Sequence, residues 1–230
     1  MCWLNAKTDI APDASWATMW DPKYKGVVSI VDDATTFMPT IPIYLGFPNP
    51  FSLDSAQMKQ MHDKLFALRG NLTHLTASID DQTTDFANGQ VVMGVLYNIS
   101  TQVVLRKQGV AMTQIIPKEG AAAWSDNMVI TKGSGAQKLD LVYDFMNYSL
   151  SVPWQARFAS TSGNTGILSY EEATSPEAQK AGMTKEALAT TLIPYLKEGP
   201  SLFEKLHLGQ EIPNLDEWLN MWNEFKLGLG

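Results

Sequence analysis

The first half of the chain alternates between short apolar runs and stretches in which apolar residues recur at helical spacing. The run GVVSIV at 26–31 is closed by Asp32 and Asp33, and its apolar character is typical of a strand buried on both faces. Apolar residues at 58, 61, 65 and 68 predict a helix that ends at Gly70. The same patterns predict strands at 72–78, 90–98 and 111–117 and helices at 80–89 and 99–109. This alternation predicts an α/β fold, with a mostly parallel sheet flanked by helices.

The pattern changes after residue 124. The stretch NMVIT at 127–131 predicts one more strand. Apolar residues at 139, 142, 143, 146 and 150 share one helical face, so a helix is expected there. From about residue 151 the chain reads as short helices separated by turn residues, which predicts a helical C-terminal region.

Composition limits the classes of protein to be considered. The chain has 230 residues, of which 45% are hydrophobic and 18% charged, as is ordinary for a globular protein. Its net charge of −7 and the lack of a basic stripe argue against nucleic acid as a partner. The single cysteine, Cys2, allows neither an intrachain disulfide nor a cysteine zinc cluster. The N-terminal residues contain no basic segment followed by an apolar one, so no export signal is expected in the chain as written.

Motifs for catalysis are missing from the sequence. The three histidines, at 62, 74 and 207, are widely spaced and belong to no H-E-x-x-H motif. There is no G-x-S-x-G elbow, Walker loop or G-x-G-x-x-G fingerprint either. We therefore expect a protein that is not an enzyme and that uses no metal or cofactor.

Acidic and aromatic residues follow the predicted strands. Asp33 follows the run at 26–31, Tyr97 ends the strand at 90–98, and Trp124 and Asp126 lie at the change of pattern. Ligands of open α/β sheets bind outside the carboxyl ends of strands. Carboxylates satisfy an ammonium group and aromatic faces attract its positive charge, so an organic cation is one candidate ligand. The alternative is structural: Asp32 only caps the helix that follows, Tyr97 is a core residue, and Trp124 is a packing residue.

Three stretches resemble a known family. SWATMWDPKYKGVVSIVDDATTF at 15–37, FANGQVVMGVLYNIS at 86–100 and VVLRKQGVAMTQIIPKEGAAAWSDNMVI at 103–130 are similar to segments of periplasmic polyamine-binding proteins. These are the spermidine/putrescine-type members of the family 1 extracellular solute-binding proteins of ABC importers. The most specific feature is the Trp-x-Asp that follows P-K-E-G. The resemblance runs in order from Trp3 to about residue 160.

The resemblance implies a periplasmic binding protein-like fold of type II, with two lobes that close on a ligand. It implies that Trp124 and Tyr97 pack against the methylene chain of a cationic amine, and that Asp126 and Asp33 hold its ammonium groups. Thr36 stands where the family often has Glu, and Tyr97 where it has Trp, so a shorter diamine or another amine becomes an alternative to spermidine. Gln210 is the nearest candidate for a glutamine that the family's C-terminal helices contribute.

The resemblance also implies that most of the first lobe is missing and that the fold is truncated. Residues 8–122 with 166–230 would form the second lobe, and residues 123–165 a remnant of the first. We expect a substrate-binding component that partners a membrane permease, located in the periplasm by resemblance. The alternative is a lobe that no longer transports and acts as an oligomerising or interaction module. Apolar surface left by the missing sheet would then favour a homodimer or a domain swap.

Overall fold

The computed structural model describes residues 1–96, 99–133, 138–191, 193–198 and 204–229. The chain divides into two compact units, one formed by Met1–Trp124 with Phe203–Gly230 and the other by Ser125–Leu202. We describe each unit by itself.

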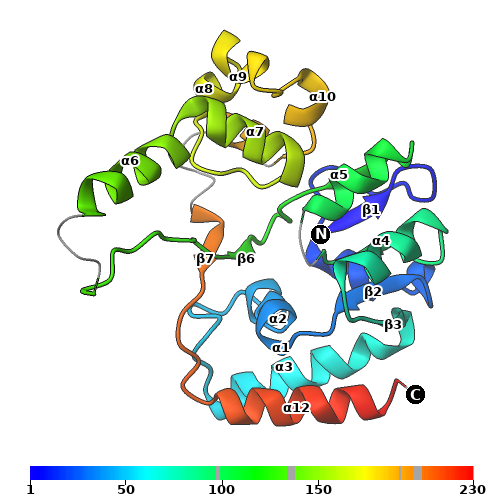
Figure 1. Cartoon of the computed structure of the whole chain (residues 1–230). Coiled ribbons are helices and arrows are strands. Elements are labelled where there is room, and N and C mark those ends of the chain that lie inside the picture. The colour runs from blue at the N-terminus through cyan, green and yellow to red at the C-terminus, as the bar shows by residue number, and fades with distance from the viewer. Residues whose placement is uncertain (97–98, 134–137, 192, 199–203, 230) are drawn as a thin grey trace. The chain divides into compact units, whose positions relative to one another are not determined.

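The first unit is built on a five-stranded sheet with the order β3-β2-β4-β1-β5 (Figure 1). β2 pairs in parallel with both β3 and β4, and β1 is antiparallel to β4 and β5. The strands are β1 (Cys2–Leu4), β2 (Val28–Val31), β3 (Leu72–Thr76), β4 (Met93–Gly94) and β5 (Met112–Gln114). Every residue of β2 is buried, as its apolar run predicted, and the α/β class is confirmed.

Helices cover both faces of this sheet. Strand side chains alternate between faces, and β1 shows the result: Trp3 joins one hydrophobic core, whereas Cys2 and Leu4 join another. The first core includes side chains of α1 (Ala34–Phe37), α3 (Ser55–Ala67) and α12 (Leu215–Leu227), and it packs against Tyr44 of α2 (Thr40–Tyr44). The second includes side chains of α4 (Ile79–Ala87) and α5 (Ser100–Lys107). Short 3₁₀ helices η1 (Trp16–Trp20), η2 (Pro22–Tyr24) and η3 (Arg69–Asn71) complete this unit's helices among the described residues.

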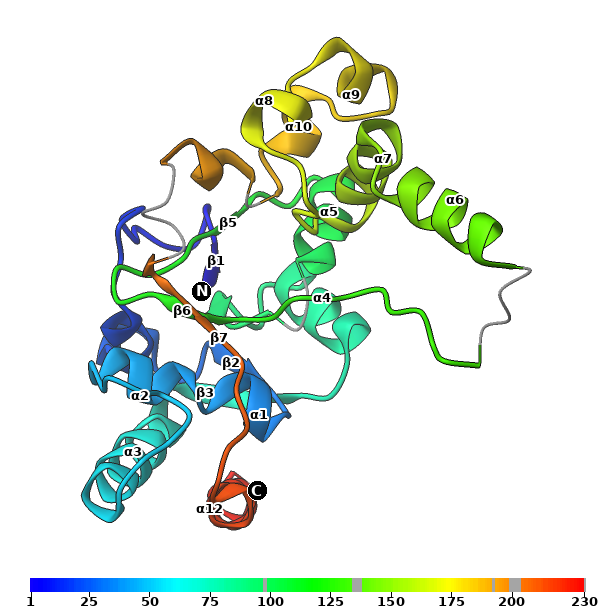
Figure 2. The same ribbon diagram turned by 90° about the vertical axis from the view of Figure 1, so that its left-hand side faces the viewer.

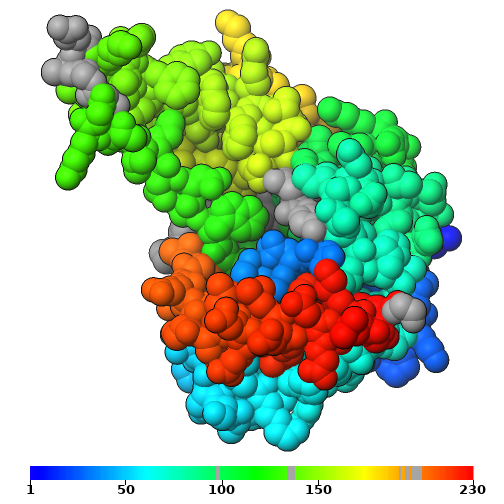
Figure 3. Space-filling model, turned by 60° about the horizontal axis from the view of Figure 1, so that its bottom comes forward, coloured from blue at the N-terminus to red at the C-terminus, as the bar shows by residue number. Residues whose placement is uncertain are grey.

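The helix α3 confirms its predicted apolar stripe. Met58, Met61 and Leu65 are buried, and Asp54 forms a capping box with Gln57 at its start. α12 lies beside α3 (Figures 2 and 3). The aromatic residues of α12 are buried. Arg69 fixes the end of α12, because its guanidinium donates to the carbonyl oxygens of Glu224 at 2.7 Å and Phe225 at 2.8 Å.

A second, two-stranded sheet also belongs to the first unit. β6 (Ala121–Ala123) pairs in parallel with β7 (Leu206–Leu208), so segments far apart in sequence run side by side here. The amide of Ala121 donates to the carbonyl oxygen of Lys205 at 2.9 Å, and the amide of Gly209 donates to that of Ala123 at 2.9 Å.

The predicted strand at 127–131 is wrong, because these residues form no regular secondary structure. Val129 is 80% exposed. A strand needs a neighbouring strand for its backbone hydrogen bonds. The strand that does form is β6, which begins six residues earlier and pairs with β7. The predicted strand at 90–98 is also shorter than expected, with only Met93–Gly94 in the ladder; its residues 97 and 98 lie outside the described ones.

The regular secondary structure described in the second unit, Ser125–Leu202, is all helical. Its elements are α6 (Leu139–Ser149), α7 (Val152–Ser162), α8 (Tyr170–Ala173), α9 (Pro176–Lys180), α10 (Lys185–Leu188) and the 3₁₀ helix η5 (Ile193–Glu198). A small core joins α7 to the later helices through Ala156, Ala159, Leu168, Ala178 and Ile193. The two units begin and end at other residues than the predicted lobes, which are 8–122 with 166–230 and 123–165. The assignment of the units to lobes stays a prediction.

No helix in the described part of the chain is both long enough and apolar enough to cross a membrane.

Candidate functional site

Asp33 lies two residues after the end of β2 and is the N-cap of α1. Its Oδ1 accepts hydrogen bonds from the amide of Thr36 at 2.9 Å and the hydroxyl of Thr35 at 2.8 Å. Partial burial pulls the pKa of Asp33 upward, but these hydrogen bonds outweigh it, and the pKa lies below its ordinary value. Because its pKa is lowered, Asp33 is ionised at neutral pH. Its hydrogen bond with the amide of Thr36 makes it the N-cap of α1. The predicted cap at Asp32 is therefore wrong by one residue, because Asp33 accepts the hydrogen bonds at the start of α1. A cap does not prevent the Asp33 carboxylate from also meeting a cation.

Thr36 lies in the first turn of α1 and is exposed. The cap brings it next to Asp33, so these two predicted site residues are neighbours in the structure as well as in sequence. A hydroxyl at this position carries no charge. The start of α1 thus presents one carboxylate, where a glutamate in place of Thr36 would supply a second.

The neighbouring Asp32 has a different environment. Its carboxylate accepts from Lys226 Nζ at 2.8 and 2.7 Å and from Trp222 Nε1 at 3.1 Å. Both partners belong to α12, so Asp32 joins the end of β2 to the C-terminal helix. Its charge is compensated within the protein, which leaves Asp33 as the free anionic group of the pair.

Trp124 and Gln210 follow two adjacent strand ends. Ala123 is opposite Leu208 in the parallel pair of β6 and β7, and the chain leaves this small sheet at Trp124 and Gly209. Carboxyl ends of parallel strands meet at one edge, so the structure brings Trp124 and Gln210 to the same end of the sheet. Trp124 is 68% exposed, which rules out the structural alternative of an interior packing residue for this position. Gln210 Oε1 accepts from Asn49 Nδ2 at 3.5 Å.

Asp126 is exposed and belongs to the second unit. In a strand, residues two positions apart face the same side, so a strand through Trp124 and Asp126 would let both address one ligand. That geometric argument is wrong, because β6 ends at Ala123 and residues 124–131 form no strand. The role of Asp126 in ligand binding stays a prediction. Tyr97, the remaining candidate, lies outside the described residues.

The sequence reading missed the role of Glu119. Its side chain accepts from the hydroxyl of Ser15 and from the amide of Trp16, the latter at 3.1 Å. Trp16 Nε1 also donates to the carbonyl oxygen of Gly120 at 2.8 Å. Hydrogen bonds thus join the S-W segment to the P-K-E-G segment. Together these bonds fix the start of β6 ahead of Trp124. Their separation of 104 residues explains why spacing could not reveal this contact.

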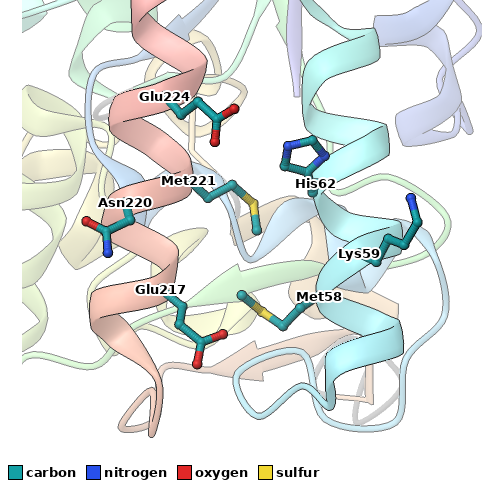
Figure 4. A pocket seen from close by; sticks show the side chains of 7 residues that line it. All are labelled: Met58, Lys59, His62, Glu217, Asn220, Met221 and Glu224. Carbon is teal, nitrogen blue, oxygen red and sulfur yellow. The ribbon is translucent and has the colours of Figure 1, made fainter.

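A surface crevice of about 400 Å³ lies between α3 and α12 (Figure 4). Met58 and Met221 lie between the helices, with Lys59 and His62 on α3 and Glu217, Asn220 and Glu224 on α12. None of the predicted site residues lines it. Within the described residues, no three His, Cys, Asp or Glu side chains are grouped so that they could hold a metal ion.

Comparisons with known proteins agree with this architecture. The chain is 29% identical over 136 residues to "Spermidine/putrescine-binding periplasmic protein 1" of Haemophilus influenzae, covering 59% of this chain and 36% of that protein. It is 27% identical over 164 residues to "Spermidine/putrescine-binding periplasmic protein" of Escherichia coli K12, covering 71% of this chain and 45% of that protein. The chain thus spans less than half of the length of these two relatives.

The fold is similar to that of the solved spermidine/putrescine ABC transporter substrate-binding protein PotD from Streptococcus pneumoniae. The TM-score is 0.74 at 21% identity, and the match covers 100% of this chain and 66% of that one. This likeness confirms the expected periplasmic binding protein-like fold of type II. The family model described as bacterial extracellular solute-binding protein matches residues 5–184. The chain therefore belongs to the bacterial extracellular solute-binding proteins.

Proposed function

We propose that this chain is a substrate-binding component of an ABC importer and that it binds a polyamine or a related organic cation reversibly, without turnover. The observation that carries the proposal is its similarity to periplasmic proteins that are named for spermidine and putrescine binding. Its partners would be the cationic amine and the membrane permease of the importer. By family, its location would be the periplasm.

The residues at the strand ends support a cation as the ligand. Asp33 is an ionised carboxylate that no described basic side chain neutralises, and Trp124 offers an exposed indole face at the end of β6. An ammonium group gains a charge-assisted hydrogen bond from such a carboxylate, and a cation–π contact contributes about 0.5–2 kcal/mol. We propose Asp126, Tyr97, Thr36 and Gln210 as the further ligand-binding residues.

The number of carboxylates at the start of α1 indicates how many ammonium groups the site would hold there. Thr36 supplies no second carboxylate beside Asp33, so the α1 end of the site would hold one ammonium group. We therefore propose a diamine such as putrescine or cadaverine ahead of the triamine spermidine.

Thermal unfolding in the presence of single ligands tests the proposal. A ligand that binds only the folded chain raises the melting temperature by mass action. Putrescine, cadaverine and spermidine should raise it in a concentration-dependent way, and 1,4-butanediol, which has the length of putrescine without its charge, should not. If the diol and the amines act alike, or if none of them acts, the proposal is wrong.

A second candidate function is an oligomerising or interaction module that has kept the fold without transport. One observation favours it: α6 exposes several large apolar side chains. A homodimer or a domain swap would cover such a surface. Light scattering distinguishes this candidate, because it predicts a mass of two chains together with no thermal shift by any amine.

A further inference from the structure

The carboxylate of Asp32, one position before the candidate ligand residue Asp33, is held by two side chains of α12. Lys226 Nζ donates to both of its oxygens, at 2.8 and 2.7 Å, and Trp222 Nε1 donates at 3.1 Å. Trp222 is buried, and its ring centroid lies 6.1 Å from that of Phe37 in α1. The C-terminal helix thus places a positive charge beside the start of α1.

This ion pair changes the charge that a ligand at Asp33 would meet. The Cα atoms of adjacent residues are about 3.8 Å apart, so the carboxylates of Asp32 and Asp33 lie within about 10 Å of each other. Charges at this separation still interact, because the Debye length is about 8 Å at physiological ionic strength. Among the described residues, no basic side chain forms an ion pair with Asp33. Lys226 therefore reduces the net charge at the end of β2 from two negative charges to one.

We propose that Lys226 sets the affinity of the candidate amine site for cations through charge, because it offsets Asp32 beside the ligand-binding carboxylate of Asp33. The proposal rests on the function proposed above, since it concerns how strongly the same site attracts its cation. Lys226 acts here without touching the ligand. The C-terminal helix then limits this end of the site to the attraction of a single carboxylate.

Calorimetric titration of putrescine into charge variants tests the proposal. Lys226→Met leaves Asp32 uncompensated, so the affinity should rise by about two- to fivefold. This is the factor expected for unit charges about 9 Å apart at an effective dielectric constant of about 40–80. Asp32→Asn leaves Lys226 uncompensated, so the affinity should fall by a similar factor. The double variant restores the net charge and should bind putrescine as the parent chain does.

The opposite signs separate an effect of charge from an effect of structure. Lys226→Met and Asp32→Asn break the same contact with α12, so a purely structural role would change the affinity in the same direction in both. Lys226→Arg keeps the charge and should bind as the parent chain does. The differences among the variants should also shrink at about 0.5 M salt, because screening shortens the range of the charges.

Lys23→Met is the matched control for the loss of one positive charge from an acidic protein. Lys23 forms an ion pair with Asp9 and precedes β2, whereas Asp33 follows this strand of four residues, which is about 13 Å long. At that separation the charge is screened, so putrescine affinity should stay unchanged. Melting curves check that each variant is folded.

The results that would overturn this proposal differ from those that would overturn the proposed function. No saturable binding of putrescine, cadaverine or spermidine by the parent chain contradicts the proposed function, and this proposal with it. Binding by the parent chain contradicts this proposal alone if Lys226→Met and Asp32→Asn leave the affinity unchanged or shift it in the same direction. An equal rise of affinity in Lys23→Met contradicts it as well.

Discussion

Lys226 and Asp32 form an ion pair that joins the C-terminal helix to the end of the buried strand β2. The two shortest N–O distances are 2.8 and 2.7 Å, and 194 residues separate the partners. Trp222 donates a third hydrogen bond to the same carboxylate. Two adjacent aspartates therefore have separate roles: Asp32 holds α12, and Asp33 caps α1 and stays available to a ligand.

We expect Lys226→Met and Asp32→Asn each to lower the free energy of unfolding by about 1–2 kcal/mol, because each removes charge-assisted hydrogen bonds from a partly exposed pair. Urea unfolding of both variants and the double variant gives the coupling energy between them. A coupling energy near zero would show that the pair contributes nothing to holding α12.

Two substitutions of Asp33 separate its two roles. Asp33→Ala should cost about 1 kcal/mol of stability because the N-cap is lost, whereas Asp33→Asn should cost little because Asn caps well. Both should weaken putrescine binding, since both remove the charge. Equal stability loss in the two variants, measured by urea unfolding, would argue that Asp33 is not an effective cap.

Acid titration gives a further test of Asp33. Its pKa is lower in the folded state than the ordinary value of 3.8. The carboxylate therefore contributes stability that is fully present above the ordinary value and is lost as the pH falls through the folded-state pKa. Below pH about 4, Asp33→Asn should lose stability less steeply than the parent chain. Identical slopes for the two proteins would contradict the lowered pKa.

Gly120 is the residue that lets β6 approach the segment before β7. Its φ is +99°, and a Cβ atom there would collide with the carbonyl oxygen of Lys205. Gly120→Ala should lower the free energy of unfolding by more than about 2 kcal/mol. Gly133→Ala is the matched control, since nothing lies within 4 Å of its Cβ position. Similar melting temperatures for both variants would mean that the β6 and β7 pairing is dispensable.

Cys2 should be unreactive in the folded protein. Burial raises the pKa of its thiol to about 12, although the nearby amino group and the hydrogen bond to Gly94 act in the opposite direction. Ellman's reagent at mildly alkaline pH should label the native chain slowly and the urea-unfolded chain quickly. Rapid labelling of the native chain would show that β1 opens readily.

The parts of the fold that depend on local sequence were predicted well. The buried strand at 26–31 and the helical stripe from Met58 to Leu68 follow from the spacing of apolar residues, and caps such as Asp54 mark the ends. The error at 127–131 has a different cause, because an apolar pattern gives strand preference without supplying a neighbouring strand.

The residues of the candidate site likewise fall into one pair that local sequence brings together and one that depends on contacts distant in sequence. Asp33 and Thr36 are brought together by a helix cap, which is local. Trp124 and Gln210 follow the same end of the sheet formed by β6 and β7, whose paired residues lie more than 80 positions apart in sequence. Only the structure shows this pairing. Glu119 could not be singled out, because its partners are at the other end of the unit's sequence.

The most direct test of the central claim is calorimetric titration of putrescine into the parent chain and into Asp126→Asn. Binding of a cationic amine through the proposed residues predicts saturable heat for the parent chain and an affinity about tenfold or more lower for the variant, as expected for a lost charge-assisted hydrogen bond. If putrescine, cadaverine and spermidine all give no saturable heat, or if Asp126→Asn binds them as the parent chain does, the proposed amine site is contradicted.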